Sequence, residues 1–128
     1  MLFYIQKGKY KRVPLHGDLA PENIITCHSD DTCELARIID FEWARVGDPL
    51  WDYAYYWGWL ESVDKKTATS WAEIMKKKLS ASDFKMLDGY RVLFHAWTMR
   101  DAVDYKGSRI RARRAHESED VLKNQTAY

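Results

Sequence analysis

Apolar and polar positions divide this chain into a strand-forming first part and a helical second part. Val13–His16 has the composition of a short strand, which Gly17 ends. Two β-branched runs follow, Asn23–Cys27 and Leu35–Phe41, and the polar turn-forming residues between them predict a β-hairpin. The predicted order is therefore strand, loop, strand, turn and strand.

From Asp48 onward the apolar residues recur at helical spacing. Asp48 and Pro49 are typical of a helix start, and aromatic residues on nearly every side of 49–61 predict that this helix is buried. The pattern predicts further helices over Thr69–Leu79, from a cap at Ser82, and over about Ile110–Lys123. We therefore expect an α+β fold, in which a short β-hairpin platform precedes mostly α-helices.

The composition excludes several classes of protein. The chain has 128 residues, 46% hydrophobic and 30% charged, as in one soluble globular domain or a part of one. Its net charge of +1 argues against nucleic acid as a partner. No run approaches the roughly 18 apolar residues of a membrane helix, and the start lacks the features of a signal peptide. We therefore expect a cytoplasmic protein with no nucleic-acid and no membrane partner.

Two cysteines flank the predicted turn. We expect Cys27 and Cys33 to face each other across the hairpin and to remain free thiols in a reducing cytosol. Together with His28 they lack the paired spacing of zinc modules, so the sequence argues against a metal site there.

Acid and amide side chains stand at the ends of the predicted strands. Asp18 lies in the loop after the first strand, Asn23 begins the second, and Asp40 lies near the end of the third. Because a hairpin brings its second strand back to the end where the first began, Asp40 should lie beside Asn23. Phosphoryl transfer from a nucleotide needs a carboxylate near the acceptor hydroxyl and hard oxygen ligands for Mg²⁺. Turn chemistry explains Asp18 taken alone, whereas the three residues together favour phosphoryl transfer.

The same residues resemble a known family. The segment HGDLAPENI, residues 16–24, is similar to the catalytic loop of the protein-kinase-like superfamily, with the pattern His-x-Asp-x-x-x-x-Asn. The segment IIDFEWARVGDPLWDYA, residues 38–54, resembles the next motif of the aminoglycoside phosphotransferase and choline kinase-like branch. Gly17 in place of arginine, and Glu42 in place of glycine, favour this small-molecule branch.

This resemblance implies the C-terminal lobe of a protein-kinase-like fold. It implies that Asp18 is the catalytic base, and that Asn23 and Asp40 hold Mg²⁺ and with it the nucleotide, ATP or GTP.

The resemblance also implies residues that support the site. His16 would brace the loop and Asp48 would open the following helix, where a helix N-cap is its simplest role. Asp52 would be a buried support on that helix. Its carboxylate must find donors, and the backbone N–H groups of the catalytic loop are candidates.

Kinases of this superfamily carry an N-terminal lobe ahead of the catalytic loop, whereas fifteen residues precede His16 here. We divide the chain into a lead-in over 1–14, a catalytic section over 15–54 and a helical section over 55–128. We expect an N-lobe to be supplied in cis or by another chain, and an uncovered aromatic face to favour self-association.

Two functions follow from the sequence. One is phosphoryl transfer from ATP or GTP to a hydroxyl of a small molecule, such as an aminoglycoside-like antibiotic or an amino alcohol. The isolated chain would then have little or no activity. The alternative is a non-catalytic module, derived from such a lobe, that binds ligands or other proteins.

Weaker features lie in the last third of the chain. Arg109–Arg114 is basic enough to contact an anion, but the acidic residues after it favour a solvated helix with internal ion pairs. Asp101 and Asp104 are candidates for binding a cationic substrate, and we expect His95 in the core or on a helix surface.

Overall fold

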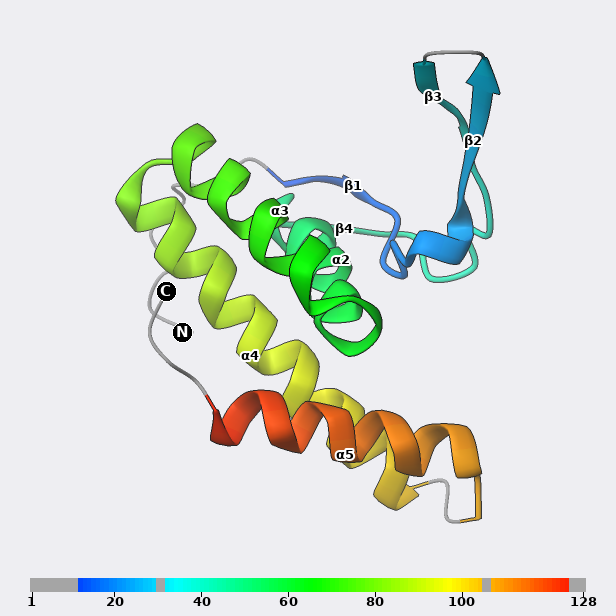
Figure 1. Cartoon of the computed structure of the whole chain (residues 1–128), viewed down its shortest axis with the longest axis vertical. Coiled ribbons are helices and arrows are strands. Elements are labelled where there is room, and N and C mark those ends of the chain that lie inside the picture. The colour runs from blue at the N-terminus through cyan, green and yellow to red at the C-terminus, as the bar shows by residue number, and fades with distance from the viewer. Residues whose placement is uncertain (1–11, 30–31, 105–106, 125–128) are drawn as a thin grey trace.

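The computed structural model describes residues 12–29, 32–104 and 107–124. In these ranges, small antiparallel strand pairs precede four α-helices, so the α+β prediction is confirmed (Figure 1). The elements in chain order are β1 (Val13–Leu15), the 3₁₀ turn η1 (Pro21–Asn23), β2 (Ile24–Ser29), β3 (Thr32–Ile38), β4 (Arg45–Gly47), α2 (Leu50–Val63), α3 (Lys65–Lys78), α4 (Ala81–Asp104) and α5 (Arg109–Lys123).

The strands form two separate pairs. The predicted hairpin is present as β2 and β3, with Ile24 opposite Ile38 and an irregularity after Ile25. It projects away from the helices (Figure 1), which is why most of its side chains are exposed. The sequence pattern missed β4, which pairs antiparallel with β1 so that Leu15 lies opposite Arg45. A strand of three residues is too short to show an alternating pattern.

The two cysteines do not face each other directly, contrary to the prediction. Cys27 pairs with Glu34, and His28 pairs with Cys33. Adjacent positions of a strand point to opposite faces, so the two thiols lie on opposite sides of the hairpin. Both are free, as expected.

Side-chain caps shift two helix starts from their predicted positions. The helix predicted from Thr69 begins at Lys65, because Asp64 accepts hydrogen bonds from the backbone N–H groups of Lys66 and Thr67. The next helix is capped by Ser80 rather than by Ser82. The Ser80 hydroxyl accepts from the backbone N–H of Asp83 at 3.1 Å.

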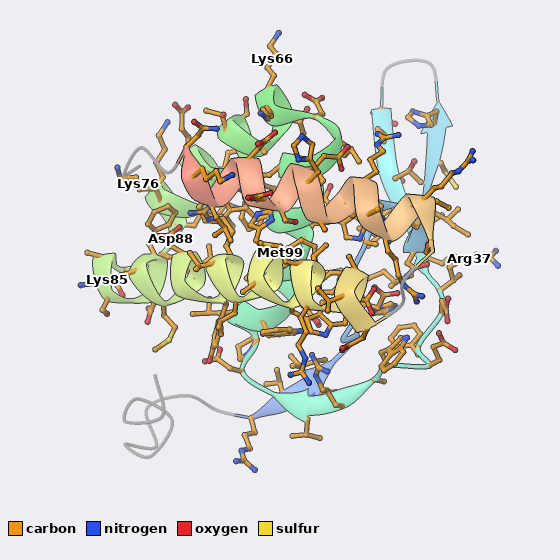
Figure 2. The ribbon with its side chains drawn as sticks, turned by 90° about the horizontal axis from the view of Figure 1, so that it is seen from below. Arg37, Lys66, Lys76, Lys85, Asp88 and Met99 are labelled. Atoms are coloured by element: carbon orange, nitrogen blue, oxygen red, sulfur yellow. The ribbon has the colours of Figure 1, made fainter. Side chains whose placement is uncertain are left out.

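The core lies among α2, α3 and α4 and is rich in aromatic residues. Trp57 and Leu87 are fully buried at its centre, and Trp71 and Phe84 pack around Trp57. The charged ends of surface residues point away from it, as Lys66, Lys76 and Lys85 show in Figure 2. The prediction of a buried α2 is correct for half of its fourteen positions; most of the others are half-buried, and Tyr53 and Val63 are exposed.

A second, polar cluster joins α2, α4 and α5. The buried Glu61 carboxylate accepts from Arg91 at 3.1 Å and lies 2.8 Å from Nε2 of His95. Nδ1 of His95 lies 3.1 Å from the Ser118 hydroxyl. The order serine, histidine, acid resembles a hydrolase triad, but the Ser118 and His95 side chains have no exposed surface and so cannot meet a substrate. The cluster therefore serves packing, with His95 in the core.

No helix in the described part of the chain is long and apolar enough to cross a membrane.

Candidate active site

The loop between β1 and η1 is held by a carboxylate on α2. The backbone N–H of His16 donates to Oδ2 of Asp52 at 2.7 Å, and that of Gly17 donates to Oδ1 at 2.9 Å. The contact expected for Asp52 is therefore present. Gly17 has a φ of +84°, and a Cβ at this position would collide with the carbonyl oxygen of Trp43. Only glycine fits the loop here, which gives a physical reason for the residue at this point of the motif.

His16 connects the loop to the end of β3. Its Nδ1 lies 3.3 Å from the backbone N–H of Asp18, and its Nε2 lies 2.7 Å from the carbonyl oxygen of Ile39. Nδ1 faces an N–H donor and therefore acts as the acceptor, without a proton. Nε2 faces a carbonyl oxygen and therefore carries the proton, so the contacts fit the Nε2–H tautomer. The ring also packs against Phe41, with the centroids 4.6 Å apart. His16 thus braces two segments and is buried away from any proton-transfer role.

Asn23 bonds directly to Asp18. Its Nδ2 donates to the Asp18 carbonyl at 2.9 Å and to the Asp18 carboxylate at 3.3 Å. The backbone carbonyl of Asn23 accepts from the N–H of Ile39 at 3.0 Å, which places the following residue, Asp40, beside this pair. The hairpin therefore brings all three chemistry-bearing residues to one end of β2 and β3.

Asp40 lies at a sharp turn of the backbone. Its φ is +65°, a left-handed conformation that is uncommon for residues other than glycine but accessible to aspartate. Its side chain is exposed. A carboxylate on such a turn is open to a ligand in solution.

The donor set at this end of the hairpin fits Mg²⁺. With Nδ2 of Asn23 turned towards Asp18, Oδ1 is the amide atom left to bind a cation, and Asp40 adds a carboxylate. Within the described ranges no three His, Cys, Asp or Glu residues gather around one point. Mg²⁺ often uses only one or two carboxylates together with water and substrate phosphates, so two protein ligands suffice.

Asp48 precedes α2 and contacts residues of α2 and α4. Its Oδ1 accepts from the backbone N–H of Leu50 at 2.9 Å, and its Oδ2 accepts from the Tyr90 hydroxyl at 3.2 Å. Pro49 has helical dihedral angles, so Asp48 acts in effect as the predicted cap. The second bond ties this cap to α4.

Tyr55 lies near Asp18 and was not predicted from the sequence as a candidate site residue. It is buried, it packs in one cluster with Ala20 of the loop, and it lies close enough to Asp18 for the two side chains to interact electrostatically. Burial is the largest cause that raises the pKa of Tyr55 far above its usual range, and the nearby Asp18 raises this pKa further. It follows Asp52 by three residues, so both side chains lie on the same face of α2. The spacing from Asp52 could have indicated Tyr55 in the sequence, but Tyr55 stands in a run of aromatic residues that all have the pattern of a helix core.

The acidic residues late in α4 are already paired. Asp101 lies 2.8 Å from Arg111, and Asp104 lies 3.5 Å from Arg100. These pairs argue against the expectation that the two carboxylates bind a cationic substrate. Arg113 pairs with Glu117 at 2.8 Å, in agreement with the predicted ion pairs within the last helix.

Comparison with known proteins assigns a family to this fold and site. Residues 5–91 match the phosphotransferase enzyme family, so the chain belongs to this family. The match contains the catalytic loop, the hairpin and α2, and it ends within α4. No curated protein and no solved structure matches the chain.

Proposed function

We propose that this chain transfers the γ-phosphoryl group of ATP or GTP to a hydroxyl of a small molecule. The observation that carries the proposal is the direct bond from Asn23 to Asp18, in a loop that Asp52 and His16 fix against the end of β3. The exposed Asp40 follows Ile39, whose backbone N–H donates to Asn23, so Asp18, Asn23 and Asp40 lie at the same end of the hairpin. Family membership supports the same class of reaction.

In this proposal Asp18 is the catalytic base. It accepts the proton of the acceptor hydroxyl, whose oxygen forms a bond to the γ-phosphorus while the bond from that phosphorus to the bridging oxygen breaks and the nucleoside diphosphate leaves. Asn23 keeps the Asp18 carboxylate oriented through its amide nitrogen. Asn23 and Asp40 would hold Mg²⁺, which neutralises phosphate charge when bound.

The exposed apolar residues around the hairpin support an N-lobe in cis or in trans. Phe41, Trp43 and Val46 are each more than half exposed, and Ile25 and Leu35 add to the same part of the chain. A nucleotide-covering lobe would bury these side chains, and self-association would cover them in its absence. Free thiols at Cys27 and Cys33 fit a cytoplasmic location.

The test compares the full-length wild-type protein with an Asp18→Asn variant. Transfer of labelled γ-phosphate to a panel of small alcohols, including an aminoglycoside and choline, is measured with Mg²⁺ and ATP or GTP. We expect Asp18→Asn to lower turnover about 100- to 10,000-fold. Nucleotide affinity should be nearly unchanged, because the base does not hold the phosphates. The control is Glu73→Gln, an exposed residue on α3.

Full turnover by Asp18→Asn would show that the base assignment is wrong.

The exposed apolar residues also favour a second candidate, a non-catalytic protein-interaction module. That function would be supported if the wild-type protein transferred no phosphate and its affinity for Mg²⁺–ATP did not depend on Asp40.

A further inference from the structure

A groove opens beside the catalytic loop, between α2, α4 and α5. Its volume is about 300 Å³, near the lower end for small-molecule sites. Four aromatic residues, Tyr55, Trp59, Phe94 and Trp97, line it together with polar and charged side chains. Tyr55 and Phe94 join the groove to the site, because both line the groove and both pack in one cluster with Ala20 of the loop.

The charges in the groove differ from those of a site for cations. Asp101 is paired with Arg111 and Glu117 is paired with Arg113, so the carboxylates that line the groove are neutralised. Arg114 has no carboxylate partner among the residues that the structure describes. The lining charges therefore sum to one positive charge in excess.

Arg114 is also held in place near the catalytic side of the groove. Its guanidinium stacks over the Trp59 ring, 4.4 Å from the centroid. It lies close enough to Tyr55 for its charge to oppose the rise in the pKa of that hydroxyl. A stacked guanidinium keeps its N–H edge free, and that edge matches a carboxylate or a phosphate.

We propose that this groove is the acceptor pocket and that it takes a small alcohol with a planar apolar body and one anionic group. The ring packs against the aromatic wall, the anion binds Arg114, and the hydroxyl points past Tyr55 towards Asp18. The inference rests on the proposed phosphotransferase function and adds the class of acceptor. A polycationic sugar fits this groove poorly, because its ammonium groups meet Arg114 and find both acidic residues of the lining already paired.

The experiment uses three probes that share a ring and a hydroxyl and differ in charge. They are para-(hydroxymethyl)benzoate, the neutral para-(hydroxymethyl)benzamide and the cationic para-(hydroxymethyl)benzylamine. Binding to the full chain is followed by NMR on the indole N–H signals of Trp59 and Trp97, assigned with Trp→Phe variants. We expect the benzoate to bind about tenfold more tightly than the benzylamine and to shift both signals.

Arg114→Gln should weaken benzoate binding about tenfold and leave benzamide binding unchanged. Arg114→Lys keeps the charge and should retain part of the preference. The matched control is Arg109→Gln, which removes an exposed arginine from the same helix outside the groove and should change nothing. Equal affinity for the three probes, or binding that leaves both indoles unshifted, would overturn the proposal. So would a loss of ATP affinity in Arg114→Gln with benzoate binding intact.

These measurements need no nucleotide, so they separate the pocket from the reaction. If the benzoate binds as expected but the active protein never phosphorylates it, the proposed role as acceptor pocket is overturned. If the protein phosphorylates the benzylamine in preference to the benzoate, the acceptor class is wrong while the phosphotransferase function stands. Preferential phosphorylation of the benzoate, lost in Asp18→Asn, supports both.

Discussion

At the scale of residues, a single carboxylate holds the loop between β1 and η1. Asp52 accepts from two successive backbone N–H groups, those of His16 and Gly17. Both of these residues are buried, so without Asp52 their N–H groups would lose a partner that water cannot readily replace. The position of the loop therefore depends on an acid on α2, thirty-six residues after His16.

Asp52→Asn should loosen this loop. An amide has one oxygen, so it can satisfy only one of the two N–H groups with its acceptor while its NH₂ group faces the other. We expect a loss of about 1–3 kcal/mol in the free energy of unfolding. Hydrogen exchange at the amides of His16 and Gly17 should become faster in the same variant. Unchanged exchange at both amides would contradict the role assigned to Asp52.

At the scale of elements, the close approach of α2 and α4 requires a glycine. A Cβ at Gly58 would collide with the ring of Phe94, which packs edge-on against Tyr55 at 4.9 Å between centroids. Because Tyr55 and Phe94 also pack with Ala20 of the loop, this helix contact sets the position of a residue close to Asp18. Gly89, in α4, has no neighbour near the position of a Cβ.

The two glycines form a matched pair for mutation. Gly58→Ala forces α2 and α4 apart and should lower stability by about 1–3 kcal/mol. Gly89→Ala removes a flexible residue from a helix interior and should raise stability by about 0.5–1 kcal/mol. Urea unfolding measures both. A rise in stability in both variants would mean that helix propensity, and not the packing against Phe94, decides the effect at Gly58.

At the scale of the whole molecule, a buried polar cluster fixes the last helices to the rest of the fold. Burial alone would lower the pKa of Arg91, but the charges of Glu61 and Asp88 outweigh it, so the pKa is raised and the guanidinium stays charged. Glu61 holds both Arg91 and His95, and His95 reaches Ser118 on α5. Figure 2 shows α4 and α5 side by side, and the cluster joins both of these helices to α2.

Glu61→Gln should be costly because it leaves Arg91 buried with a weaker partner. We expect a loss of about 3–5 kcal/mol in the free energy of unfolding, the scale for breaking a buried ion pair. Ser118→Ala removes one neutral hydrogen bond of the same cluster and should cost about 1 kcal/mol. Thermal and urea unfolding of the two variants give the comparison. Equal losses would show that the charge of Glu61 contributes little.

Local patterns predicted much of the architecture and the chemistry of this chain. The hairpin followed from two β-branched runs around polar turn residues, and its geometry indicated that Asp40 returns to Asn23. Helix boundaries were less well predicted, because Asp64 and Ser80 took the capping roles. Several residues near a helix start can serve as caps, and the packing of the whole helix selects among them.

The sequence by itself determined the residue types and spacings that make phosphoryl transfer chemically accessible: Asp18, Asn23 and Asp40 at the ends of neighbouring strands. Only the tertiary structure decided which distant groups complete them. Asp52 and Tyr55 meet the loop because α2 packs against it. Arg111 and Arg113 are paired, whereas Arg114 has no carboxylate partner among the residues that the structure describes. Spacing along a chain predicts contacts within one element, whereas contacts between elements depend on how buried faces fit together.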